Sequence, residues 1–265
     1  MRADVYLTTN GYAPSRGRAR LMIESGCVTV DGETVKKPAE EISDGAHSVV
    51  VEDPLAYVSR GGLKLEGALD TFGIDVSGAV ALDVGASTGG FTDCLLQRGA
   101  TRVYAVDAGE RQLAKKLCED ARVISREHLN ARELAPEHVG GERVNIIVMD
   151  VSFMSATYIL PRFPALLSEG GEVVILVKPQ FEVGKAMLGK GGIVKDPTAH
   201  RYAVERVCEC ATLCGLVPVG LIPSPIKGGD GNREFLLHLT CRSGATPLTA
   251  RDVRRVADRN STEGS

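Results

Sequence analysis

Apolar and polar residues follow two different patterns along the chain, and the pattern changes near residue 57. Beyond that point, short apolar runs typical of buried strands alternate with segments whose apolar residues recur at helical spacing. Strands are expected near residues 79–84, 102–107, 144–150 and 172–178. Helices are expected near residues 91–98, 110–118, 155–167 and 198–214. This alternation predicts an α/β domain with a parallel sheet covered by helices on both faces.

The first part of the chain predicts a small α+β unit instead. Ser15 is a suitable N-cap for a short helix, and Gly26 stands where that helix would end. From residue 28 to residue 35, β-forming residues flank Asp31-Gly32, a dipeptide typical of two-residue hairpin turns. We therefore expect one helix followed by a β-hairpin.

A glycine-containing stretch separates the two patterns. It follows a third strand, which is expected at residues 49–51, and it includes Gly61-Gly62. Near the C-terminus, a short helix is expected from residue 250 to residue 260. The expected bounds are residues 1–54 for the first domain, 55–62 for a linker, 63–245 for the second domain and 246–265 for a C-terminal tail.

The composition excludes several classes of protein. A net charge of -3 and a pI near 6.0 exclude a strongly basic nucleic-acid coat, so any RNA contact must come from local patches. The seven cysteines show no C-x-x-C spacing, which disfavours a disulfide framework and a zinc site and fits a reducing compartment. The densest apolar run, Val173–Val177, is far shorter than the ~20 residues that span a bilayer. With no secretory signal visible, these features predict a cytoplasmic protein.

A glycine-rich turn follows the first strand of the second domain. The strand Val80–Val84 leads into Gly85-Ala86-Ser87-Thr88-Gly89-Gly90-Phe91, where a helix is expected to begin. A nicotinamide fingerprint would place a glycine where Ser87 stands, which argues against a dinucleotide. The next strand ends in Asp107, whose carboxylate can accept hydrogen bonds from both hydroxyls of an adenosine ribose. The candidate cofactor residues here are Asp83, Gly85, Ser87, Thr88, Gly89, Gly90, Phe91 and Asp107.

Opposite charges stand at the ends of two later strands. Asp150 and Lys178 each end a strand, so both are expected at the carboxyl edge of the sheet, where open α/β folds place ligands. A solvated salt bridge is the alternative, but Lys178 follows five apolar residues, an unusual place for a surface lysine. With Lys64 and Glu234, the set reads Lys-Asp-Lys-Glu, which resembles the tetrad of ribose 2′-O-methyltransferases.

Longer motifs make a family resemblance specific. The turn Ala86–Thr92, the block Lys178-Pro179-Gln180-Phe181-Glu182-Val183-Gly184-Lys185, and Gly191-Gly192 with Asp196-Pro197 resemble the TlyA family. These are bacterial ribosomal RNA methyltransferases, historically labelled haemolysins, and the resemblance covers nearly the whole chain. It implies a Rossmann-like S-adenosylmethionine-dependent methyltransferase domain preceded by a small α+β S4-like RNA-binding domain. The implied target is a cytidine 2′-hydroxyl in the ribosomal RNA of a ribosomal subunit, with no metal.

The resemblance also assigns roles to single residues. It implies that Lys64, Asp150, Lys178 and Glu234 are catalytic. Cofactor contacts extend to Asp150 and to Asn130, where Glu127-His128-Leu129-Asn130 matches the family's Glu-Arg-Thr-Asn only at its first and last positions. RNA contacts are implied for Arg16, Arg18, Arg20 and Arg60.

Two alternatives for the mechanism and two for the function stay open. Lys178 is the candidate base, because burial and a second ammonium would lower a lysine pKa. Carboxylates very close to it would instead keep it charged, and Lys178 would then align the substrate electrostatically. A non-catalytic ribosome assembly factor and a membrane-active haemolysin are the other functional readings; the occupied tetrad argues against the first, and the lack of apolar spans against the second.

Overall fold

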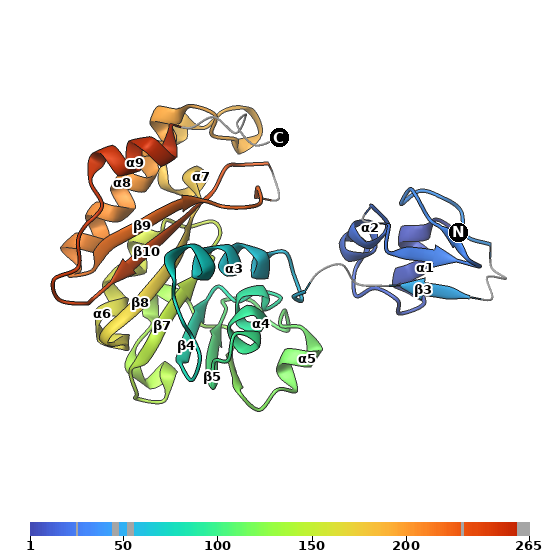
Figure 1. The fold of residues 1–265 in the computed structure, drawn as a ribbon, viewed down its shortest axis with the longest axis horizontal. Coiled ribbons are helices and arrows are strands. Elements are labelled where there is room, and N and C mark those ends of the chain that lie inside the picture. Colours follow the sequence, from blue (N-terminus) through green and yellow to red (C-terminus); the bar gives the residue numbers. More distant parts are fainter. Residues whose placement is uncertain (25, 44–47, 52–55, 229–230, 259–265) are drawn as a thin grey trace. The chain divides into compact units, whose positions relative to one another are not determined.

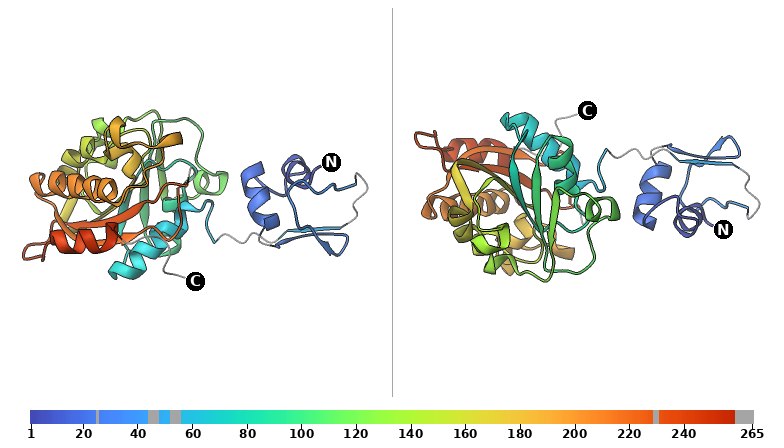
Figure 2. Two further views of the ribbon diagram at one scale, coloured as in Figure 1. Left: turned by 90° about the horizontal axis from the view of Figure 1, so that it is seen from above. Right: turned by 90° about the horizontal axis from the view of Figure 1, so that it is seen from below.

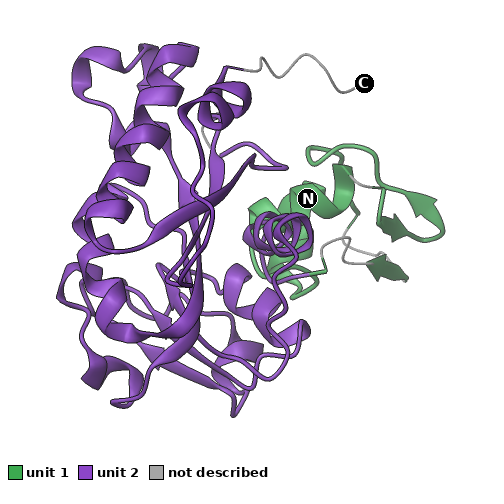
Figure 3. Cartoon of the chain, turned by 60° about the vertical axis from the view of Figure 1, so that its left-hand side comes forward, with its two compact units in different colours: residues 1–56 green, residues 57–265 purple. Residues whose placement is uncertain are grey.

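The structure is a computed structural model of the 265-residue chain, and it describes residues 1–24, 26–43, 48–51, 56–228 and 231–258 (Figure 1). The chain forms two compact units, Met1–Ala56 and Tyr57–Ser265 (Figure 3). The division falls within the segment 55–62 that we expected to be a linker. Tyr57 is buried in the second unit, and a side chain at Gly62 would collide with its ring at 2.3 Å. The last residues of this segment therefore pack as part of the second unit.

Among its described residues, the first unit contains two helices and a three-stranded antiparallel sheet. Asp31 and Gly32 both have positive φ angles, 51° and 86°, as a tight hairpin turn requires. The predicted helix, hairpin and third strand are confirmed, whereas the first helix was not predicted because little more than Ala3 and Leu7 marks its buried face. The elements are α1 (Ala3–Thr9), α2 (Arg16–Glu24), β1 (Val28–Val30), β2 (Glu33–Thr34) and β3 (Val49–Val51), with sheet order β2-β1-β3.

A seven-stranded sheet of order β6-β5-β4-β7-β8-β10-β9 forms the centre of the second unit. Five strands pair in parallel, but β10 pairs antiparallel with both β8 and β9. The prediction of a parallel sheet is therefore wrong at this end, where a loop joins β9 directly to its neighbour β10 without a crossover helix. The strands are β4 (Val80–Val84), β5 (Arg102–Val106), β6 (Val123–Arg126), β7 (Val144–Met149), β8 (Leu167–Val177), β9 (Val217–Pro223) and β10 (Phe235–Thr240).

Helices cover both faces of this sheet, as predicted (Figure 2). One buried cluster joins the sheet to α3 and α4, and the other joins it to α8 and α9. The long α8 begins where Asp196 accepts the Thr198 N–H at 2.9 Å, with Pro197 in the first helical position. The helices are α3 (Gly61–Phe72), α4 (Gly90–Gln97), α5 (Lys115–Cys118), α6 (Phe163–Leu166), α7 (Pro179–Glu182), α8 (Pro197–Leu213) and α9 (Ala250–Ala257).

Two predicted helices are much shorter than expected. The segment 155–167 forms two 3₁₀ turns and then α6, because Pro161 and Pro164 cannot donate the hydrogen bonds of a continuous helix. The segment 110–118 is helical only from Lys115, after Arg111 with a φ of 52°. Over the part of the chain that the structure describes, no helix has the length and apolar character needed to cross a membrane.

Candidate active site

The glycine-rich turn between β4 and α4 lies directly against the end of the neighbouring strand. Gly85 has a φ of 83°, and a Cβ there would lie 2.6 Å from the carbonyl oxygen of Asp150. Ser87 is also left-handed, with a φ of 48°, which is uncommon for a residue with a side chain. The turn therefore needs glycine at position 85, and it brings the backbone of the loop close to the carboxyl end of β7.

Asp107, at the end of β5, is bound to the same turn. Its Oδ2 accepts the Ser87 N–H at 2.8 Å, and its Oδ1 accepts the Gly109 N–H at 2.7 Å. Next to it is a cavity of about 380 Å³, which Asn130 also lines. The structure thus brings together three residues predicted for the cofactor from separate segments. Other residues around this cavity are Gln112, Leu129, Val151, Phe153 and Met154.

A second cavity of about 300 Å³ adjoins the first. Gly85, Ser87, Asp150 and Ser152 line both of them. The second cavity differs in charge, because several cationic side chains reach it. They are Arg60, Lys64, Lys178 and Lys227.

The four predicted catalytic residues form two ion pairs beside the second cavity. Lys64 Nζ lies 2.6 Å from Glu234 Oε2, and Lys178 Nζ lies 2.6 Å from Asp150 Oδ1. Lys178 also donates a hydrogen bond of 2.8 Å to Ser152 Oγ. Side-chain exposure is 11% for each lysine and 3% for Glu234, so these charges are largely removed from water. Asp150 and Lys178 follow the ends of β7 and β8, Glu234 precedes β10, and Lys64 lies in α3, so segments far apart in the sequence meet here.

Asp83 is a fully buried carboxyl group close to these residues. Thr92 Oγ1 donates to its Oδ2 at 2.7 Å, and its Oδ1 has no hydrogen-bond partner among the described residues. Burial raises the pKa of Asp83 to about 7, and the nearby negative charges of Asp150 and Asp107 add to the shift. Three carboxyl groups therefore gather at the ends of β4, β5 and β7.

This arrangement bears on the type of cofactor that the site can hold. A pyrophosphate would add negative charge to a region that already concentrates it. A ligand with a sulfonium and an ammonium group would neutralise the carboxylates of Asp107 and Asp150, which line the first cavity close to the buried Asp83. The donor set fits S-adenosylmethionine better than a dinucleotide.

The shifted pKa of Asp83 predicts a pH dependence of stability. Between its ordinary value of 3.8 and about 7, the folded state keeps a proton that the unfolded state has lost. The free energy of unfolding must therefore fall as the pH rises through this window, by about 4 kcal/mol in total. Urea unfolding of the ligand-free protein measures this effect. The free energy of unfolding of Asp83→Asn, relative to that of the unsubstituted chain, should rise by about 3 kcal/mol between about pH 5 and pH 8. A difference that does not change with pH would contradict this assignment.

Glu182 is a buried residue whose role sequence reasoning missed. It belongs to α7, which follows Lys178, and its Oε1 accepts the Ala156 N–H at 2.7 Å while its Oε2 accepts the Ser155 hydroxyl. Burial raises the pKa of Glu182. The carboxyl group ties the loop that follows Asp150 to the helix that follows Lys178. The only hint in the sequence was that Glu182 belongs to the Lys178–Lys185 block, and this block does not indicate that Ser155 and Ala156 are its partners.

Phe153 was also missed. Its side chain is 92% exposed at the wall of the first cavity, and its backbone is left-handed with a φ of 67°. The ring centroid of Phe181 lies 5.6 Å away. An exposed aromatic ring in a strained loop beside a site leaves no periodic signal in the sequence. The same holds for Lys227, which reaches the second cavity from the loop before β10.

The arginines predicted to bind RNA lie at two places in the chain. Arg60 precedes α3 and lines the second cavity. Arg16, Arg18 and Arg20 lie on α2, whose predicted N-cap is supported by a hydrogen bond of 3.2 Å from the Arg18 N–H to Ser15 Oγ. Across the described residues, no three His, Cys, Asp or Glu side chains come together as they would around a metal ion.

Comparison with known proteins supports both units. Residues 57–241 match the model of the FtsJ-like methyltransferase family, and residues 1–47 match that of the S4 domain. The Mycobacterium tuberculosis 16S/23S rRNA (cytidine-2′-O)-methyltransferase TlyA is 44% identical over 264 residues, 99% of this chain and 98% of the relative. Hemolysin A of Brachyspira hyodysenteriae is 44% identical over 238 residues, 90% of this chain and 99% of its own. A solved structure of a Streptococcus thermophilus protein that bears the name hemolysin has a TM-score of 0.77 and 41% identity, and the match covers 97% of this chain and 94% of that chain.

Proposed function

Since the chain belongs to the FtsJ-like methyltransferase family and carries an S4 domain, as its resemblance to TlyA proteins predicted, we propose that it methylates ribosomal RNA. The proposed reaction moves a methyl group from S-adenosylmethionine to a cytidine ribose 2′-hydroxyl. The observation that carries this proposal is the double ion pair, Lys64–Glu234 and Lys178–Asp150, beside a cavity that adjoins the cofactor cavity. The activity named for the Mycobacterium tuberculosis relative supports the choice of cytidine and of ribosomal RNA.

The first cavity is the proposed cofactor site. Asp107 and Asn130 would hold the adenosine part, and the carboxyl group of Asp150 would face the charged methionine part. Asp83, predicted for the same role, is completely buried and lines neither cavity, so it would act on the ligand only through its nearby charge. When bound, S-adenosylmethionine supplies a methyl group that its sulfonium already activates. The turn from Gly85 to Gly90 would let the ligand approach the backbone closely.

The second cavity is the proposed site of the ribose. A ribose hydroxyl is a weak nucleophile at neutral pH, so the protein must orient it and take up its proton. Lys178 can do this as a base, or as an ammonium that orients the hydroxyl while water takes the proton. Asp150 and Ser152 hold the amino group of Lys178 at 2.6 and 2.8 Å, which fixes its position at the cavity wall. Arg60 and Lys227 would attract the phosphates that flank the target nucleotide.

Asp107→Ala should weaken S-adenosylmethionine binding by about 1.5–3 kcal/mol, because charge-assisted hydrogen bonds to the ribose are lost. The backbone of the turn at Ser87 also loses its acceptor, which adds to the effect. Titration calorimetry on the purified protein measures the change. Asp107→Asn is the matched variant, since it keeps the size of the side chain but removes the charge and one acceptor. Unchanged affinity in Asp107→Ala would mean that this residue is purely structural.

Mapping of 2′-O-methyl groups tests the function itself. We expect the 16S or 23S ribosomal RNA of purified, intact subunits to gain a ribose methyl group when protein and S-adenosylmethionine are added together. Subunits taken from cells that lack the gene supply the unmethylated substrate. A methyl group on a base, or no methyl group on either subunit, would contradict the proposal.

A further inference from the structure

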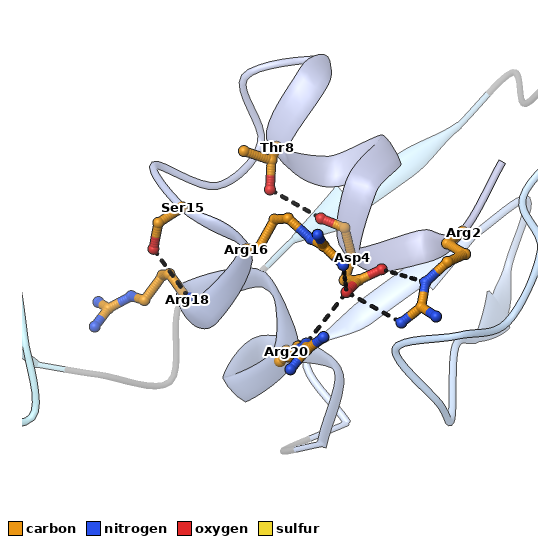
Figure 4. Close-up of polar contacts among 7 residues, drawn as sticks. All are labelled: Arg2, Asp4, Thr8, Ser15, Arg16, Arg18 and Arg20. Carbon is orange, nitrogen blue, oxygen red and sulfur yellow. Dashed lines mark hydrogen bonds and ion pairs between the residues drawn. The ribbon is translucent and has the colours of Figure 1, made fainter. Parts of the chain in front are cut away.

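Three arginines of the first unit meet on one completely buried carboxylate. Asp4 of α1 has no exposed surface. Its Oδ1 accepts Arg2 Nε at 3.0 Å, and its Oδ2 accepts Arg16 Nη2 at 3.0 Å and Arg20 Nε at 3.2 Å (Figure 4). The hydrogen bond from Arg2, followed by those from Arg16 and Arg20, holds the pKa of Asp4 far below its usual range. The group is therefore an anion at every pH at which the protein works.

One carboxylate does not neutralise three guanidinium groups. The cluster of Asp4 with its three arginines keeps a net charge of about +2, since Arg remains charged at any relevant pH. Side-chain exposure is 46% for Arg2, 54% for Arg16 and 51% for Arg20. Arg16 and Arg20 each use a single nitrogen on Asp4, out of five N–H donors per guanidinium. Asp4 therefore holds the arginines in place, while guanidinium N–H groups that do not bond to Asp4 face the solvent.

Without an anion at its centre, such a cluster would not form. Like charges held this close repel one another, and free arginine side chains would separate at the surface. Guanidinium forks bind phosphate oxygens in a bidentate geometry, and holding them in place beforehand lowers the entropy cost of binding. A buried anion that supports exposed cations is therefore suited to a polyanionic partner.

We propose that Asp4 is a positioning residue for RNA binding: it holds Arg2, Arg16 and Arg20 in one array that binds backbone phosphates. The inference rests on the proposed function, because it takes RNA as the partner of the first unit. It adds Arg2, which lies outside α2, to the RNA-binding set. We expect Arg18 to contribute less to RNA binding than these three, since its side chain points away from Asp4 in Figure 4.

The sign of one substitution separates positioning from simple attraction. Asp4→Asn keeps the size of the side chain and gives the protein one more positive charge. If RNA responded only to net charge, this variant would bind more tightly. If Asp4 positions the arginines, the variant binds more weakly in spite of the added charge. A purely structural role would change the stability of the unit but not the number of phosphates that it contacts.

The experiment uses the full-length chain and purified, unmethylated 30S and 50S ribosomal subunits, with binding measured over a range of salt concentrations. Asp4→Asn should weaken binding roughly 10-fold, as expected for disordered charge-assisted contacts. Arg2→Gln, Arg16→Gln and Arg20→Gln should each weaken it at least about 5-fold and lower the salt slope by about 1. Arg18→Gln is the matched comparison from the same helix, and its effect should be smaller than that of Arg2→Gln.

Hydrogen exchange at the amides of α1 and α2 reports whether Asp4→Asn still folds. If it does not fold, the three arginine variants test the inference instead, because they leave Asp4 unchanged. Tighter or unchanged binding by folded Asp4→Asn would overturn the inference, and so would wild-type affinity of Arg2→Gln. If the unsubstituted protein binds neither subunit, the proposed function fails instead, and the two failures remain distinct.

Discussion

Removal of residues 1–54 should abolish methylation of ribosomal RNA and leave S-adenosylmethionine affinity within about twofold of that of the full chain. Structured RNA is read mainly through its shape and backbone, and the S4 domain is the part of the chain suited to that task. The cofactor cavity is built entirely from residues beyond Tyr57. Methyl transfer to purified subunits and calorimetry with the cofactor measure the two effects separately.

A substitution can achieve nearly the same result without a deletion. Arg16, Arg18 and Arg20 changed together to Glu should remove most of the methylation and reduce the salt dependence of RNA affinity. Cofactor affinity again serves as the control, because the second unit has hydrophobic clusters of its own. If the truncated chain methylated subunits at the full rate, the first unit would be dispensable for recognition.

Local signals predicted the elements that carry the site. The glycine-rich turn after β4, the acid Asp107 after β5, and the charged residues Asp150 and Lys178 after β7 and β8 each lie within a few residues of the strand that positions them. In a parallel sheet, the carboxyl ends of these strands meet at one edge, so their proximity follows from the order of elements. Lys64 and Glu234 could be assigned only through the family resemblance, since 170 residues separate them.

What could not be predicted depends on partners that are distant in sequence. The role of Glu182 comes from Ser155 and Ala156, 27 and 26 residues away, and no spacing rule links these positions. Asp4 reads as an ordinary residue in the first turn of a helix, and only the fold shows that Arg16 and Arg20 converge on it. Likewise, β10 pairs with both β8 and β9, and β9 pairs with β10, so these two strands are defined by their pairing more than by a local pattern.

Lys178→Ala should lower turnover by roughly 10²–10⁴-fold while the fold and the affinities for S-adenosylmethionine and RNA stay near normal. The amino group of Lys178 acts on the hydroxyl in the transition state and adds little to ground-state binding. Single-turnover rates with saturating cofactor and subunits measure the loss. Lys185→Ala is the matched control, because this exposed lysine belongs to the same motif but lines neither cavity.

Lys178→Arg then distinguishes the two possible roles of this residue. Arginine keeps the positive charge and can still pair with Asp150, but it cannot give up a proton near neutral pH. An inactive Arg variant supports proton transfer to Lys178, whereas a substantially active one makes the residue an electrostatic aligner of the hydroxyl. In either case Asp150 and Ser152 would keep the amino group in place, since both already contact it. Activity of Lys178→Ala close to that of the unsubstituted enzyme would remove the residue from the catalytic set, and the ion pair with Asp150 would then be structural.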